Sequence, residues 1–194
     1  SGTSSHAWWD IVRGVTKKLE SDNTNIEETD TTGLKSFDSD GFTLGTSAQV
    51  NHSGVTNVAW NWLAGGGQGS ANSDGTFATT YTSANQTAGF SISQFTVSGS
   101  GNVSFGHGLG AKPKLVITKS TSHTTNWNVY HEDTSASPQN DYLFLNTTAA
   151  KSNSSLTGFT STTVGVAASS YEEIIYAFKS IKGFSKIGTY VGNG

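Results

Sequence analysis

Residues 106–117 read Gly-His-Gly-Leu-Gly-Ala-Lys-Pro-Lys-Leu-Val-Ile, and this stretch decides the fold class. A glycine-rich phosphate loop follows a strand and opens a helix, whereas Pro113 here leads into the apolar run 115–117. We therefore interpret the glycines as turn residues that supply positive φ angles. The segment after Pro113 is a predicted β-strand.

Short apolar or alternating runs of the same kind recur on both sides of this stretch, each bounded by turn residues. Such spacing is typical of an antiparallel β-sandwich and predicts an all-β fold. The apolar residues of 11–20 also fit one face of a helix, which is the only helix the sequence predicts. The predicted strands are 42–44, 55–63, 76–82, 89–97, 102–105, 114–119, 127–131, 142–145, 164–166, 173–179 and 185–191.

The composition narrows the class of protein further. The 194 residues include no Cys, so disulfides, thiolate metal sites and cysteine nucleophiles are excluded. Only 13% of the residues are charged and the net charge is -3, which gives no electrostatic basis for binding nucleic acid or an anionic membrane. No apolar stretch approaches the roughly 20 residues that span a bilayer.

An internal repeat organises the predicted strands. The pattern Val58-Ala59-Trp60-Asn61-Trp62 matches Ile174-Ile175-Tyr176-Ala177-Phe178. We therefore expect Trp60 to superpose on Tyr176, and Phe37 on Phe159.

The repeat predicts four parts of the chain, which we expect to be a piece of a longer tandem array. Residues 1–64 are the C-terminal half of a first sandwich, 65–72 a Gly-rich joint, 73–182 a complete sandwich and 183–194 the first strand of another. A half-sandwich leaves an open edge and an apolar face. We expect residues 184–194, from the same or an adjacent chain, to complete it.

Several segments resemble a repeated module of structural proteins of marine tailed phages. They are residues 73–75 with 88–92, 106–117, 127–131 and 142–150, together with 36–45 and 183–190. The module is of concanavalin-A-like or laminin-G-like type. The resemblance implies an antiparallel jelly roll in a tail fibre or on a virion surface, and it implies no reaction.

Three residues form a candidate carbohydrate site. Trp127 and His131 share one face of a predicted strand, and His107 lies between glycines near the start of another. An exposed indole stacks on the apolar face of a sugar while histidine binds its hydroxyls. The alternative is that Trp127 is a core residue of the sandwich, because large aromatics dominate core energetics.

Other residues suggest contacts or a metal ion. Trp8 and Trp9 point to opposite sides of an extended chain, so one of them is a candidate for a protein interface. Asp38 and Asp40 have the alternate spacing of calcium ligands, although the third ligand and the distal Glu of a calcium-binding loop are missing. Asn72-Ser73-Asp74-Gly75 has a similar pattern, and Asx turns are the favoured explanation of both segments over a calcium loop. We expect no cofactor, calcium being the one ion that the pattern allows.

The sequence predicts a non-enzymatic structural protein of a virion. Glu172 and Glu173 are adjacent, so they face opposite sides of a strand and cannot form the carboxylate pair of a glycosidase. The expected partners are copies of the chain in a homo-oligomer, other virion proteins and host-surface glycans. The alternatives are an extracellular carbohydrate-binding module of a secreted bacterial protein and, less favoured, a glycan hydrolase.

Overall fold

The computed structural model describes residues 4–96, 98–99, 101–135, 140–153, 159–167 and 170–193. These residues form an all-β protein of antiparallel sheets, as the sequence predicts. Its one short helix, α1 (Ala48–Asn51), lies outside the predicted complete sandwich. Residues 1–3, 97 and 194, which predicted elements include, are outside the described part of the chain.

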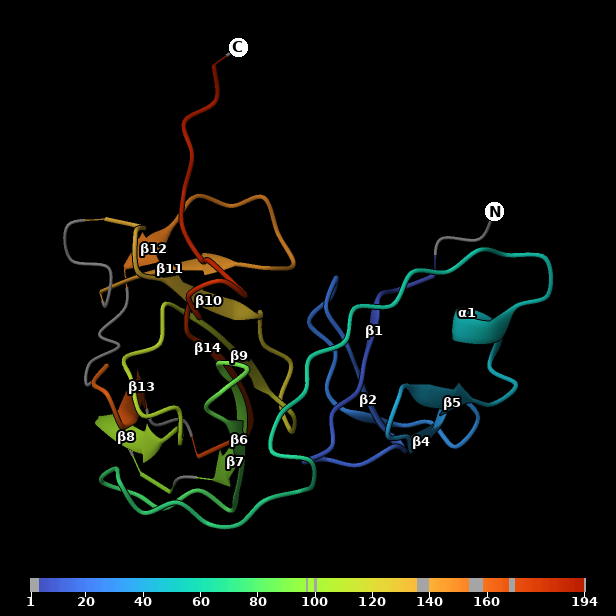
Figure 1. Cartoon of the computed structure of the whole chain (residues 1–194), viewed down its shortest axis with the longest axis horizontal. Helices are drawn as coiled ribbons and strands as arrows, with labels where there is room; N and C mark the ends of the chain where they lie inside the picture. The colour runs from blue at the N-terminus through green and yellow to red at the C-terminus, as the bar shows by residue number, and fades with distance from the viewer. Residues whose placement is uncertain are drawn as a thin grey trace.

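A seven-stranded antiparallel sheet is the centre of the structure (Figure 1). Its strand order is β12-β11-β10-β9-β14-β7-β6, so the C-terminal strand β14 lies in the middle, between β9 and β7. The strands are β6 (Tyr81–Asn85), β7 (Phe90–Thr96), β9 (Leu115–Ser120), β10 (Asn128–His131), β11 (Asp141–Phe144), β12 (Ser152–Asn153) and β14 (Glu172–Phe178).

A two-stranded sheet of β8 (Asn102–Gly106) and β13 (Thr163–Ala167) covers one face of the large sheet and makes it a sandwich. Apolar side chains from both sheets form a single core cluster between them. Its members are Phe95, Val103, Phe105, Leu109, Val116, Tyr130, Val164, Val166, Ile175 and Ala177.

Residues 4–64, here called the N-terminal lobe, cover the opposite face of the large sheet. The lobe contains a three-stranded sheet and a separate hairpin. Its buried side chains join a second core cluster with Phe90, Ile92, Ile117, Trp127, Ile174 and Tyr176 of the large sheet. The lobe's strands are β1 (Ala7–Trp8), β2 (Lys17–Glu20), β3 (Glu28–Thr29), β4 (Leu34–Phe37) and β5 (Phe42–Leu44).

The sequence of strand β14 explains why a layer packs on each face of the large sheet. Side chains alternate between the two faces of a strand, and here Ile174 and Tyr176 join the cluster under the lobe while Ile175 and Ala177 join the cluster under β8 and β13. All four side chains are at most 1% exposed. Because β14 is apolar on both faces, a single layer would leave one apolar face in water.

Most predicted strands are confirmed within one or two residues, from 89–97 (β7) to 173–179 (β14). The predicted strands 55–63 and 185–191 are wrong, since neither segment pairs with a strand in the described part of the chain. The predicted strand 76–82 overlaps β6 only at residues 81–82. The predicted helix 11–20 is also wrong. Gly14 has a φ of 92° and turns the chain, so residues 17–20 extend as β2 against β1.

The structure places the matched halves of the predicted repeat in different surroundings. Trp60 is 78% exposed on an unpaired segment, whereas Tyr176 is 1% exposed in the central strand. Phe37 is exposed at the end of β4, whereas Phe159 stacks on Tyr130 with ring centroids 4.0 Å apart. The prediction that the two halves share one strand arrangement is therefore wrong, because residues 4–64 form a covering layer.

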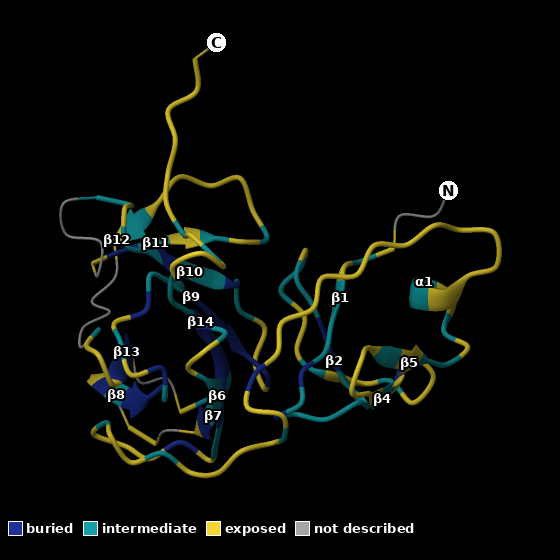
Figure 2. Cartoon of the chain, viewed as in Figure 1, coloured by how far each residue is buried: buried dark blue, intermediate teal, exposed yellow. Residues whose placement is uncertain are grey.

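Alternating apolar placement in the strands predicts six core residues, namely Leu115, Ile117, Leu143, Leu145, Ile175 and Phe178, and the structure corrects two of them. Ile117 and Ile175 are buried, and Leu115 and Phe178 pack partly buried against the lobe side. Leu143 and Leu145 are 38% and 44% exposed. They lie on or just after β11, next to the edge strand β12, where the lobe does not cover the sheet (Figure 2).

A pair of tryptophan substitutions tests the covering role of the lobe. We expect Trp127→Ala to lower the free energy of unfolding by about 3–5 kcal/mol, because it leaves a cavity between the lobe and the sheet. Trp60→Ala is the matched control and should stay within about 0.5 kcal/mol of wild type, since that ring is mostly in water. Urea denaturation measures both. Equal losses in the two variants would contradict the layer arrangement.

Candidate functional site

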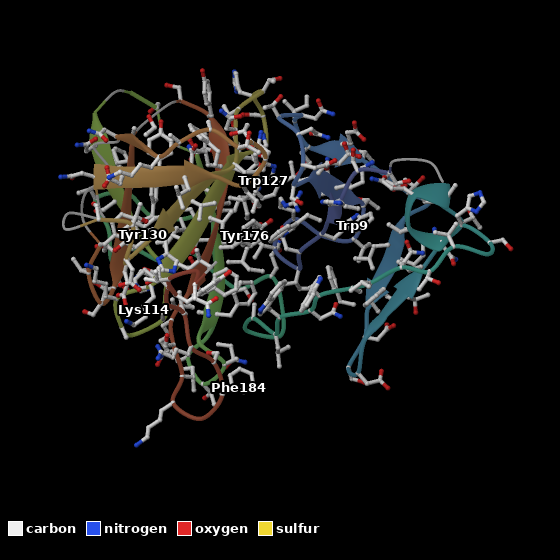
Figure 3. The ribbon with its side chains drawn as sticks, turned by 90° about the horizontal axis from the view of Figure 1, so that it is seen from above. Trp9, Lys114, Trp127, Tyr130, Tyr176 and Phe184 are labelled. Carbon is white, nitrogen blue, oxygen red and sulfur yellow. The ribbon has the colours of Figure 1, made fainter. Side chains whose placement is uncertain are left out.

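The predicted carbohydrate platform on β10 is covered by the lobe. Trp127 is fully buried, its ring centroid lies 5.3 Å from that of Trp8, and its indole Nε1 donates a hydrogen bond to the Glu20 carbonyl at 2.9 Å. Figure 3 shows Trp127 and Tyr176 at the boundary between the sandwich and the lobe. The prediction of an exposed sugar-stacking Trp127 is therefore wrong, and the alternative of a core residue is confirmed.

The two histidines of the predicted site do not join Trp127. His107 is fully buried after β8, where its Nδ1 accepts from the Leu109 N–H at 3.1 Å, and burial lowers its pKa. His131 is partly exposed at the end of β10 and its Nδ1 accepts from the Asp133 N–H at 3.2 Å. A buried His107 has no surface to offer a sugar, so its predicted role is wrong as well.

Trp8 and Trp9 lie at contacts inside the chain. The Trp8 ring packs 5.0 Å from that of Tyr176, between the lobe and the sheet. Trp9 points the other way, against Gly33, where an added Cβ would lie 2.6 Å from the indole. The predicted opposite directions are thus correct, and contact of either ring with another protein stays a prediction.

Asp38 and Asp40 lie in the exposed turn of the β4–β5 hairpin. The Asp38 N–H donates to the Gly41 carbonyl at 2.9 Å, and the Asp38 carboxylate accepts from the Thr43 hydroxyl at 2.9 Å. Within the described ranges, no three His, Asp or Glu side chains gather as metal ligands. Asp38 thus takes part in the hydrogen bonds of the hairpin turn, and calcium binding at Asp38 and Asp40 stays a prediction.

The second segment considered for calcium, residues 72–75, lines a polar groove of about 420 Å³ beside β6. Asn72 Oδ1 accepts from the Asp74 N–H at 2.9 Å, which confirms the Asx turn. Asp74 brings the only charge to the groove. Its lining residues are Ser70, Ala71, Asn72, Ser73, Asp74, Thr82, Ala84 and Gly108.

A buried ionic network joins the lobe to the large sheet, and the sequence analysis did not find it. Arg13 Nε lies 2.6 Å from Asp10 Oδ2, and its side chain is 0% exposed. The Tyr176 hydroxyl donates to the same Asp10 oxygen at 2.7 Å, and Arg13 also reaches Glu27 at 3.3 Å. The signal in the sequence was the i, i+3 spacing of an acid and a base around Ile11-Val12.

The electrostatics of this network are those of a structural link. Burial, together with the Asp10 carboxylate, raises the pKa of Tyr176 well above its ordinary value despite the nearby guanidinium of Arg13. Burial alone would lower the pKa of Arg13, but Tyr176 and Asp10 raise it. Arg13 is therefore charged and Tyr176 neutral across the physiological range, and both side chains are buried between the two layers.

Substitutions at Asp10 and Tyr176 separate charge from hydrogen bonding. We expect Asp10→Asn to cost about 3–5 kcal/mol, because it leaves the buried Arg13 without its closest counter-charge. Tyr176→Phe removes one hydrogen bond to the carboxylate and should cost less, about 1–3 kcal/mol. Chemical denaturation of both variants gives the order, and a larger loss in Tyr176→Phe would contradict this account of the link.

Lys119 is a second buried cation, located at the end of β9. It is 1% exposed, and its Nζ donates to the carbonyls of Ser120 at 2.7 Å and His123 at 3.4 Å, with the Thr24 carbonyl of the lobe at 3.5 Å. Burial lowers its pKa to about 8. The ammonium thus helps to fix the 120–125 loop and the lobe at one end of the sheet.

The lowered pKa predicts a pH dependence. Between pH 8 and 10 the unfolded chain holds this proton more tightly than the folded chain, so the free energy of unfolding should rise with pH, by a total on the order of 1–3 kcal/mol. Lys119→Met should remove that rise. Urea unfolding at several pH values measures it, and an unchanged slope in the variant would assign the effect to other groups.

The exposed apolar side chains provide the remaining candidate site. In the described part of the chain, every large apolar side chain more than half exposed belongs to residues 55–63 or 184–191. We call residues 55–63 the Trp60 segment and residues 184–193 the C-terminal segment; both are mostly exposed in Figure 2. The side chains are Val55, Val58, Trp60, Trp62, Leu63, Phe184, Tyr190 and Val191.

The Trp60 segment is anchored at one end and open along its length. Trp62 is 51% exposed, with ring centroids 5.9 Å from Phe178 and 6.4 Å from Phe90. Ala64 is buried in the cluster under the lobe. Between His52 and Ala64 the backbone pairs with no strand of the described residues, and the Trp60 ring is mostly exposed to water.

Comparison with known families places the whole chain in one of them. Residues 1–194 match the family described as Domain of unknown function (DUF7483), and the chain belongs to that family. No curated protein and no solved structure matches it. In the described residues, no helix has the length and apolar character needed to cross a membrane.

Proposed function

We propose that the chain is a non-enzymatic structural module of a phage virion, from a tail fibre or a capsid-surface appendage, that associates with further copies of itself. The observation that carries the proposal is the placement of its exposed apolar side chains. Both faces of the central strands of the large sheet are covered from within the chain. In the described residues, the large apolar side chains that remain more than half exposed are gathered in two segments that join no sheet.

Such a distribution favours association over catalysis. Contiguous exposed apolar side chains mark sites of protein contact, and unpaired extended backbone accepts a strand from another chain. Many weak contacts between identical modules gain strength through effective concentration. The resemblance to repeated modules of tailed-phage structural proteins supports the virion setting.

Sedimentation velocity of the full chain over a range of concentrations tests the associating role. We expect reversible association that grows with concentration in the micromolar range or above, as weak structural contacts do. Leu145→Ala, which removes a 44% exposed side chain outside both segments, is the control and should associate like wild type. A chain that stays monomeric at every concentration would contradict the proposal.

A second candidate, glycan binding, is favoured by the positions of Trp60 and Trp62. Residues two apart on an extended chain point to the same side, about 7 Å from one another, and both rings are at least half exposed. They offer a sugar the surface that Trp127 cannot. Binding to a glycan array that is lost in Trp60→Ala would favour this function, in a virion or in a secreted protein.

A further inference from the structure

We infer that the C-terminal segment of one copy docks on the Trp60 segment of a second copy, in a head-to-tail contact. The inference rests on the proposed self-association and names the surfaces that make it. Both segments carry exposed aromatic rings, and neither pairs with a strand of the described residues. Each could therefore supply the other with an aromatic contact and a paired backbone.

The C-terminal segment exposes large apolar side chains that another surface could cover. Phe184 is 75% exposed, and Tyr190 and Val191 are 93% and 95% exposed. The Ile181 N–H and the Ser185 carbonyl pair at 2.9 Å in an isolated bridge, and beyond residue 185 no strand pairs with the segment. Figure 3 shows Phe184 away from the body of the sandwich.

Charge selects the lobe as the surface that receives this segment. Residues 174–194 contain three Lys and no Asp or Glu, whereas residues 1–64 contain eight Asp and Glu against four Lys and Arg. Lys182 and Lys186 are exposed next to the aromatic residues. Residues 174–194 are thus net basic and the lobe is net acidic, and opposite potentials favour and orient a contact between the C-terminal segment and the lobe. The large apolar side chains of the lobe that are more than half exposed are those of the Trp60 segment.

The exposure of both segments favours a contact between two different copies. Within one chain neither segment covers the other, since Trp60 is 78% and Tyr190 93% exposed, and the end of the chain projects away from the lobe (Figure 1). A contact between two different surfaces is heterologous, and repeating it builds a ring or an open filament according to whether the rotation closes. The backbone of the Trp60 segment would gain a paired strand in each step.

Cysteine cross-linking tests the contact cleanly, because the chain contains no Cys of its own. Asn61→Cys and Thr189→Cys each place one thiol at an exposed position beside the aromatic residues and leave those residues intact. Under mild oxidation at an associating concentration, we expect a mixture of the two variants to form the mixed disulfide several-fold faster than either variant alone forms its own. The mixed product should decrease at high ionic strength, where exposed charges are screened.

Two single variants measure the energetics of the same contact. Trp60→Ala and Tyr190→Ala should each weaken association about tenfold or more, as expected for aromatic residues at the centre of an interface. Thermal unfolding confirms that both variants keep the fold. Leu145→Ala is again the control and should leave association unchanged.

The outcomes separate this inference from the proposed function. Association that persists with no preference for the mixed disulfide, or that Trp60→Ala leaves unchanged, would overturn the head-to-tail contact while the associating role stands. A disulfide that forms mainly between two Asn61→Cys chains would also overturn it, because it would indicate a symmetric contact. A chain that is monomeric at every concentration would overturn both.

Discussion

The structure depends on the covering of the second face of the seven-stranded sheet. Strand β14 is apolar on both sides, and the β8–β13 sheet buries only one of them. The lobe buries the other through Trp8, Val12 and Leu19. A buried link of Asp10, Arg13 and Tyr176 then holds the two layers in one register. An ion pair of this kind adds little stability over an apolar contact, but its directional hydrogen bonds restrict how the lobe is seated.

This covering changes the view of the functional surface. Trp127, which was predicted to stack on a sugar, is instead buried between the lobe and the large sheet. The side chains left for contacts are those that no layer reaches, on the Trp60 segment and the C-terminal segment. Buried apolar side chains contribute to the stability of the fold, and the exposed ones are those available to the proposed association. The same residue type is therefore buried in one segment of this chain and exposed in another.

Much of the sandwich could be predicted from the sequence because its signals are local. Glycine turns and alternating apolar residues predict β7, β8, β9, β10 and β14 closely. Each of these strands shows the apolar periodicity of a strand in its own sequence. The short strands of the lobe were missed, apart from β5, since two to four residues carry no period. The predicted strand 55–63 failed for a different reason. Apolar residues do alternate in this segment, but no strand in the described part of the chain pairs with it.

The sequence by itself determined the all-β class and most strands of the large sheet, because these follow from backbone preferences and from the spacing of apolar residues. It displaced β6 and missed the two-residue strand β12. The tertiary structure alone decided which apolar faces are buried. Trp127 and Trp60 have similar local surroundings in the sequence, yet one is fully buried and the other is 78% exposed. The difference arises because residues more than a hundred positions apart meet across the sheet, as Glu20 does with Trp127. Burial is a property of that long-range packing, and no local pattern contains it.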